Sequence, residues 1–136
     1  MEKETLKNIM HFLENEENKT SFKWKLLNDE PFTEEDLDVR GDLNLGFTAI
    51  TSLPKGFKVG GRLDLTDSDI ETLPEGLEVG GNLWLAGCWG LISLPKDLKV
   101  GGSLYIYRTK FTEISDNELF NMIKPNGYIG EIIGNI

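Results

Sequence analysis

The sequence has 136 residues, a net charge of −9, a single cysteine (Cys88) and a single histidine (His11). A chain of this length forms one domain that buries roughly two-thirds of the surface of its unfolded form. One cysteine excludes an internal disulfide, and one histidine removes most metal and nucleophile–base sites, so we expect no metal, cofactor or catalytic residue. The sequence contains neither a long apolar run nor a signal-peptide pattern, which predicts a cytoplasmic protein.

The negative charge is concentrated before the repeats described below. Residues 1–38 carry eleven acids and five lysines, whereas residues 39–136 carry twelve acids and nine bases. Phosphate backbones and anionic membranes are repelled by such a chain, so we expect neither a nucleic acid nor a membrane as a partner. The acidic segment is interpreted as a solvated helical cap, with a docking surface for a basic partner as the alternative.

The first 38 residues have the spacing of short helices. Residues 2–15 carry an amphipathic stripe made of Leu6, Ile9, Met10 and Leu13. Residues 21–30 fit either a strand or a helix, and a short helix that ends before Pro31 is favoured. Thr33 followed by three acids predicts an N-cap and one helical turn that leads into Val39.

Residues 39–58, 59–78, 79–99 and, in part, 100–115 are four copies of one unit. Such a fixed period is typical of a solenoid, in which each unit buries its apolar face against its neighbours. Each unit predicts one short strand, stacked in parallel and in register, and the inward positions are Leu43, Leu45, Leu63, Leu65, Leu83, Leu85, Leu104 and Ile106. A second apolar cluster and a proline follow, and a glycine pair at 60–61, 80–81 and 101–102 makes the bend into the next strand by avoiding a clash or by adopting a positive φ.

The repeated patterns LxLxxTxI (43–50), LxLxxSxI (63–70) and LxIxxTxF (104–111) resemble the leucine-rich repeat core LxLxxNxL. With the LP that follows, units of about twenty residues are similar to leucine-rich repeats of bacterial and phage proteins, including effectors that bind host proteins. The resemblance covers residues 39–114 and implies an α/β repeat solenoid with a parallel sheet. The sequence departs from the family at the glycine pairs and at the asparagine position, which holds Thr48, Ser68, Cys88 and Thr109.

Both ends of a solenoid need a cover. Residues 1–38 are predicted to be the N-terminal cap, and residues 115–136 the C-terminal one. Ser115 and Glu118 form a capping box for a helix that offers three residues for burial, Leu119, Phe120 and Ile123. The tail 127–136 is predicted to be a last strand that covers the sheet edge, with pairing to another molecule as the alternative.

The outward residues of the strands line the face on which leucine-rich repeat proteins usually bind partners. Three aromatic side chains gather at its C-terminal half, namely Trp84, Tyr105 and Tyr107, with Arg108 beside them and with Arg62 and Asp64 across from them. Aromatic residues and arginine dominate binding hot spots, so we predict a partner-binding patch. The alternatives are that Trp84 and Tyr105 only pair across strands, or that the C-terminal tail covers them.

The third repeat has one extra residue, in the segment Gly87–Leu91. Insertions in solenoids form loops, so Trp89 is predicted either to join the binding surface or to fold back into the gap. Cys88 occupies a core position of the repeat and is interpreted as a buried small residue rather than a nucleophile.

These observations favour a non-enzymatic protein-interaction module, such as an adaptor, an inhibitor or an effector, that is a monomer. The alternative is a structural protein that joins copies through its terminal strand or sheet edge. An enzyme is the least favoured, because no spacing sets up a pair of catalytic carboxylates.

Overall fold

The structure is a computed structural model that describes residues 22–28 and 30–134. Contacts divide the chain into two compact units, Met1–Asp36 and Leu37–Ile136. The helix expected over residues 2–15 lies outside the described residues. None of the helices in the described ranges is both long and apolar enough to cross a membrane.

In the first unit the ambiguous segment is a helix, α2 (Phe22–Leu27). Lys25 Nζ lies 2.6 Å from Asp36 Oδ2, which also accepts a hydrogen bond from Thr33 N at 2.7 Å. Thr33 Oγ1 accepts from Asp36 N at 3.3 Å, so Thr33 caps the short 3-10 helix η1 (Glu35–Leu37) as expected. Burial alone would raise the pKa of Asp36, but the hydrogen bonds from Lys25 and Thr33 outweigh it and lower that pKa.

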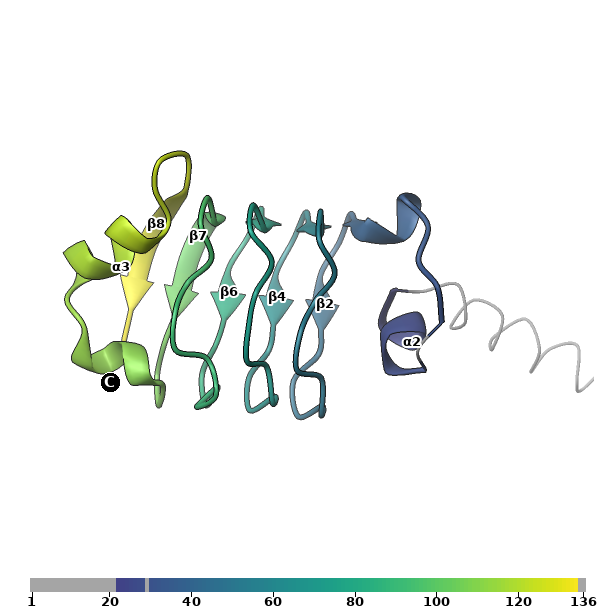
Figure 1. Cartoon of the computed structure of the whole chain (residues 1–136), viewed down its shortest axis with the longest axis horizontal. Helices are drawn as coiled ribbons and strands as arrows, with labels where there is room; N and C mark the ends of the chain where they lie inside the picture. The colour runs from purple at the N-terminus through teal and green to yellow at the C-terminus, as the bar shows by residue number, and fades with distance from the viewer. Residues whose placement is uncertain (1–21, 29, 135–136) are drawn as a thin grey trace, which may run out of the picture. The chain divides into compact units, whose positions relative to one another are not determined.

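The second unit is a solenoid of parallel strands, seen side by side in Figure 1. Each of the first three turns contributes two short strands, one before and one after the bend at residues 40–41, 60–61 or 80–81, whereas the sequence predicted one strand in each unit. The first ladder comprises β1 (Asp38–Val39), β3 (Lys58–Val59) and β5 (Glu78–Val79). The second comprises β2 (Leu43–Asn44), β4 (Leu63–Asp64) and β6 (Leu83–Trp84). The longer β7 (Lys99–Tyr105) pairs with both β5 and β6 and joins the two ladders.

The stacked turns are in register, with Leu63 opposite Leu43 and Leu83 opposite Leu63. The predicted inward residues of the strands are all buried, and so are Phe57, Leu77 and Leu98 after the prolines. Full burial of one such side chain contributes about 1.5–3 kcal/mol, so these columns are the main source of the solenoid's stability.

The glycine pairs avoid a clash between turns, which was one of the two expected reasons for them. A Cβ on Gly60 would lie 2.5 Å from the carbonyl oxygen of Arg40, and one on Gly80 would collide with that of Gly60. Positive φ occurs elsewhere, at Gly56, Gly76 and Gly87.

Short side chains occupy the same position in all four repeats, namely Thr48, Ser68, Cys88 and Thr109. Thr48 Oγ1 donates to Leu45 O, and Thr109 Oγ1 donates to Ile106 O, each at 2.7 Å. Cys88 Sγ donates instead to the carbonyl of the preceding turn, Leu65 O, at 3.0 Å. The side chains of Thr48, Cys88 and Thr109 therefore bond to the backbone at the end of a strand, whereas Ser68 Oγ lies 3.8 Å from Cys88 Sγ.

After β7 the chain forms the 3-10 helix η2 (Lys110–Glu113) and the helix α3 (Asp116–Met122). Ser115 caps α3 by accepting from Glu118 N at 3.2 Å. Leu119 and Ile123 are buried, but Phe120 is 36% exposed, so its predicted burial is wrong. The cause is the short helix, which turns only one face towards the core.

The last strand, β8 (Tyr128–Ile133), pairs in parallel with β7 and covers that edge of the sheet, as expected. Its register shifts between Val100 and Ser103, opposite the glycine pair 101–102. The second unit is thus a short repeat solenoid with a C-terminal cap made of a helix and a strand.

Candidate functional site

Three aromatic residues lie together on the outward side of the second ladder. Asp64, Trp84 and Tyr105 are register neighbours on β4, β6 and β7. The rings of Trp84 and Tyr105 stack with centroids 3.7 Å apart and planes 5° apart. The ring centroids of Tyr105 and Tyr107 lie 6.0 Å apart, and the two ring planes are tilted by 50° to each other. We call Trp84, Tyr105 and Tyr107 the aromatic patch.

The strands place these side chains because period-two alternation puts leucines inside and the intervening residues outside. All three aromatic residues are half-buried, since each ring covers part of its neighbour. The expected cross-strand pairing of Trp84 with Tyr105 therefore occurs, and it leaves part of each ring accessible. A stacked pair of this kind contributes about 0.5–1.5 kcal/mol beyond the burial of its area.

The indole Nε1 of Trp84 is buried and has no hydrogen-bond partner in the described part of the chain. An unpaired buried N–H costs about 1–3 kcal/mol. Ring stacking, rather than a hydrogen bond, therefore holds the indole in place.

Polar side chains beside the aromatic patch bond to backbone N–H groups. Asp64 Oδ1 accepts from Thr66 N, and Asn44 Oδ1 from Gly46 N, both at 2.9 Å. In the neighbouring column Asp42 Oδ1 accepts from Arg62 N at 2.7 Å, and Arg62 is an exposed residue. These side-chain oxygens accept from backbone N–H groups beside the short strands, so Asp42, Asn44 and Asp64 have a structural role that the sequence did not reveal.

Arg108 takes part in an ion pair that spans two turns. Its Nη2 lies 3.7 Å from Asp67 Oδ2, although Asp67 belongs to the second repeat and Arg108 to the fourth. Gly87 occupies the same place in the intervening repeat, and a Cβ there would collide with the Asp67 carboxylate. The absence of a side chain at Gly87 therefore lets the ion pair form.

The inserted residue in the third repeat is looped out. Leu91 N donates to Cys88 O at 3.3 Å, which closes an extra turn with Trp89 and Gly90 at its tip. Trp89 is 58% exposed and Ile92 62%, so Trp89 points into solvent instead of filling a gap. No ring contact links Trp89 to the aromatic patch within residues 37–134.

Cys88 is fully buried. Burial raises the pKa of its thiol, although contact with Ser68 acts in the opposite direction. The thiol is thus held in its protonated form, which is a poor nucleophile. Among the described residues, no group of three or more His, Cys, Asp or Glu side chains is placed to hold a metal ion.

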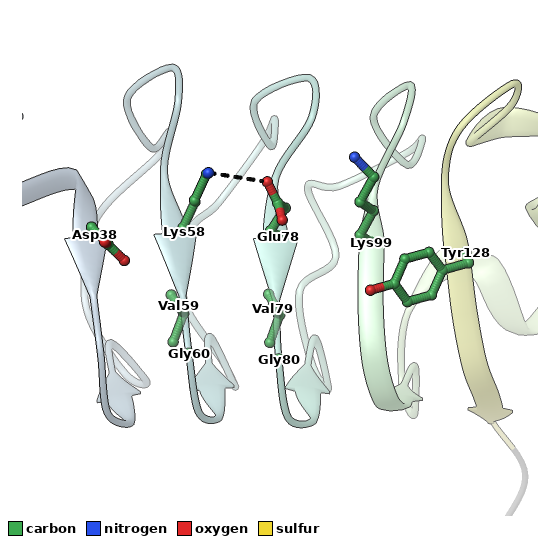
Figure 2. Close-up of a pocket in the computed structure, with 9 residues that line it drawn as sticks. All are labelled: Asp38, Lys58, Val59, Gly60, Glu78, Val79, Gly80, Lys99 and Tyr128. Atoms are coloured by element: carbon green, nitrogen blue, oxygen red, sulfur yellow. Dashed lines mark ion pairs between the residues drawn. The ribbon is translucent and has the colours of Figure 1, made fainter.

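A second surface on the first ladder was not recognised from the sequence. Outward charges alternate across the strands there, and Figure 2 shows Asp38, Lys58, Glu78 and Lys99 side by side with Tyr128. They line a shallow hollow of about 210 Å³ together with Gly60 and Gly80. Lys58 Nζ lies 3.5 Å from Glu78 Oε2. The sequence feature that could have indicated this surface is the charged residue before each Val-Gly-Gly, namely Lys58, Glu78 and Lys99.

Comparison with family models, with curated proteins and with solved structures finds no match to this chain. A functional assignment therefore depends on the geometry described above.

Proposed function

We propose that this chain is a non-enzymatic protein of the leucine-rich repeat type that binds another protein through the aromatic patch. The observation that carries this proposal is the stacked pair Trp84–Tyr105, which continues to Tyr107 on the outward side of the strands. Large rigid aromatic side chains supply contact area with little loss of conformational entropy, which is why they dominate hot spots.

The size of the strand face sets the extent of the binding surface. Adjacent strands lie about 4.8 Å apart, so the second ladder with β8 is only about 20 Å wide. A stable interface buries about 800 Å² on each partner. The proposed surface therefore also includes the exposed Trp89 loop and the flanking Arg62, Asp64 and Arg108.

The charge of the protein selects the class of partner. A net charge of −9 disfavours nucleic acids and anionic membranes, and it suits a cytoplasmic adaptor or a small acidic inhibitor with a protein target. The leucine-rich repeat type is supported by the buried leucine columns and by the hydroxyl or thiol at the asparagine position.

The test begins with affinity capture from the native host and identification of the captured protein by mass spectrometry. Binding of the purified partner is then measured by calorimetry for Tyr107→Ala and for Trp89→Ala. Each change is expected to weaken binding at least about tenfold, because truncation at a hot spot costs about 2 kcal/mol. Thr72→Ala, at an exposed position on the returning side of the second repeat, is the matched control. Unchanged affinity for both aromatic variants, at unchanged melting temperature, would show that the site is elsewhere.

A further inference from the structure

The outer edge of β8 is unpaired in the second unit. Strand β8 pairs with β7 on one side, and within residues 37–134 no strand lies on its other side. Tyr128 N donates to Leu98 O at 2.9 Å, and Ile133 O accepts from Ile106 N at 3.0 Å. Both ends of β8 therefore direct their backbone groups towards β7.

Backbone groups of successive strand residues point to opposite sides. Since Tyr128 and Ile133 face β7, their inner neighbours Ile129 and Ile132 direct their N–H and C=O groups to the open edge. The irregular step at Gly130, opposite the glycine pair of β7, is what allows both ends to face the same way. The open edge thus presents two donors and two acceptors, placed evenly about the centre of the strand.

The side chains of β8 have the same symmetry. Ile129 and Ile132 are in register with the buried Val100 and Leu104, and they point inward. At the two ends Tyr128 and Ile133 are in register with Lys99 and Tyr105 on the outward side. The side chains of β8 therefore follow the same order from either end of the strand: an outward residue, an inward residue and then the central pair Gly130 and Glu131.

We propose that two copies of this chain associate through β8, antiparallel and about a twofold axis, with Ile129 opposite Ile132 of the second copy. In this register the backbone N–H and C=O groups of Ile129 bond to those of Ile132 of the second copy, and the same pair of bonds forms again on the other side of the twofold axis. Inward side chains then meet inward ones, and Tyr128 lies opposite Ile133 of the second copy. A shift by one residue would bring inward side chains opposite outward ones, so the pattern specifies this register.

A second copy suits this edge because the edge is complementary to itself. Tyr128 is 54% exposed, and the pairing places it against an isoleucine, an aromatic–β-branched pair that stabilises antiparallel strands. Twofold contacts of this kind close after two copies and do not grow into fibres. The sequence favoured a monomer, so this proposal departs from that expectation, and it does so because of the symmetry of β8.

Dimerisation would also enlarge the outward surface. The row Trp84, Tyr105 and Ile133 would continue into Tyr128 of the second copy, which adds a third aromatic ring to this row. The proposal does not depend on the aromatic patch being a binding site, because association of copies is measured on the purified protein alone.

Glu131 gives the dimer a characteristic dependence on charge. It points outward next to the twofold axis, where it accepts from Ser103 Oγ at 3.3 Å, and its counterpart in the second copy lies diagonally across. Two like charges there, added to −9 on each chain, oppose association. Added salt and Glu131→Gln are both expected to strengthen the dimer.

The first experiment is sedimentation equilibrium of the full chain between about 1 µM and about 300 µM, because one strand pair supports only a modest affinity. The mass is expected to rise with concentration from 15.3 kDa towards twice that value, and to rise earlier for Glu131→Gln. A mass of one chain for both proteins throughout this range, in low and high salt, overturns the proposal.

The second experiment tests the register with two double variants. Tyr128→Glu with Ile133→Lys places opposite charges across the dimer, whereas Tyr128→Glu with Ile133→Glu places like charges at the same sites. The first is expected to dimerise at least about tenfold more tightly than the second, because two such pairs form in each dimer. Equal dissociation constants would overturn the register, and circular dichroism verifies that both variants are folded.

Discussion

The second repeat, residues 59–78, and the third, residues 79–99, share their strands and buried columns but differ in the turn that follows the strand. The second repeat has Asp67 and Ser68 there, and its chain returns by bonding to the turn before it, with Glu71 N donating to Thr51 O at 2.8 Å. The third has Gly87 and Cys88, and then an extra turn that exposes Trp89. After the inserted residue, Leu91 is buried at the position that Ile70 holds in the second repeat.

This difference distinguishes the positions of a repeat that maintain the solenoid from the positions that form its surface. The positions that stack across turns are the same in both repeats, because a displaced leucine would lose its register with two neighbours. The positions that face solvent are free to change, and the third repeat uses that freedom to present Trp84 and Trp89. Variation in the outward and turn positions can therefore alter function while the solenoid is kept.

The largest expected effect tests whether the two repeats are equal as scaffolds. Leu65→Ala and Leu85→Ala remove fully buried side chains at the same position of the repeat. Each is expected to lower the free energy of unfolding by about 2–5 kcal/mol, through lost burial and a residual cavity. Urea denaturation measures both. A much smaller loss for Leu85→Ala would mean that the insertion loosens the core of the third repeat.

The next effect concerns the turn itself. Gly87 has φ +76° and lies against the Asp67 carboxylate, so Gly87→Ala is expected to cost about 1–2 kcal/mol for the left-handed backbone, plus the clash. Adding Asp67→Ala should recover only the part due to the clash. A double-mutant cycle by thermal denaturation separates the two contributions. If Asp67→Ala recovers nothing, the carboxylate has moved aside without cost.

A pH-dependent effect distinguishes Cys88 from Ser68. The raised pKa of the Cys88 thiol means that the folded state favours the protonated form. That contribution is fully present below the unfolded pKa, and it is lost as pH rises through the folded pKa, by about 1.4 kcal/mol per pH unit between the two values. Wild-type protein should therefore lose more stability from pH 7 to pH 10 than Cys88→Ser. Parallel pH profiles of the two melting temperatures would contradict this.

The smallest effect on stability is expected at Trp89, where the two repeats differ most. Trp89→Ala removes an exposed side chain, so the free energy of unfolding should change by less than about 0.5 kcal/mol. Ile70→Ala, at a fully buried position of the second repeat, is the contrasting variant and should be clearly destabilised. A large loss for Trp89→Ala would show that the loop packs against the solenoid.

The sequence predicted the parts of the fold that depend on periodicity. The leucine columns, the parallel register, the Ser115 cap and the final strand at the edge of β7 are all confirmed. Each follows from a local pattern or from the need to bury an apolar face, so it can be read without coordinates.

What the sequence could not give depends on contacts between turns. The first ladder was missed because each apolar–charged–apolar run, such as Phe57-Lys58-Val59, is too short for its alternation to indicate a strand. The ion pair of Arg108 with Asp67 joins residues 41 positions apart. Phe47, Asp67 and Arg108 adopt positive φ without being glycine, which no propensity rule indicates for phenylalanine or arginine. For the candidate site, the aromatic patch was predicted, but the exposure of Trp89 was left open.

The glycine pairs at 60–61, 80–81 and 101–102 also determine how repeats can be added to this protein. Gly80 meets the carbonyl of Gly60, and Gly101 meets that of Gly80, so successive turns join through the same contact. The register is equally repetitive, since Val59, Val79 and Val100 follow one another in a single column. A duplicated unit of residues 59–78 would therefore form the same glycine–carbonyl contact with the turn before it and with the turn after it. Gene duplication, or an engineer, can lengthen the array in whole repeats without designing a new contact.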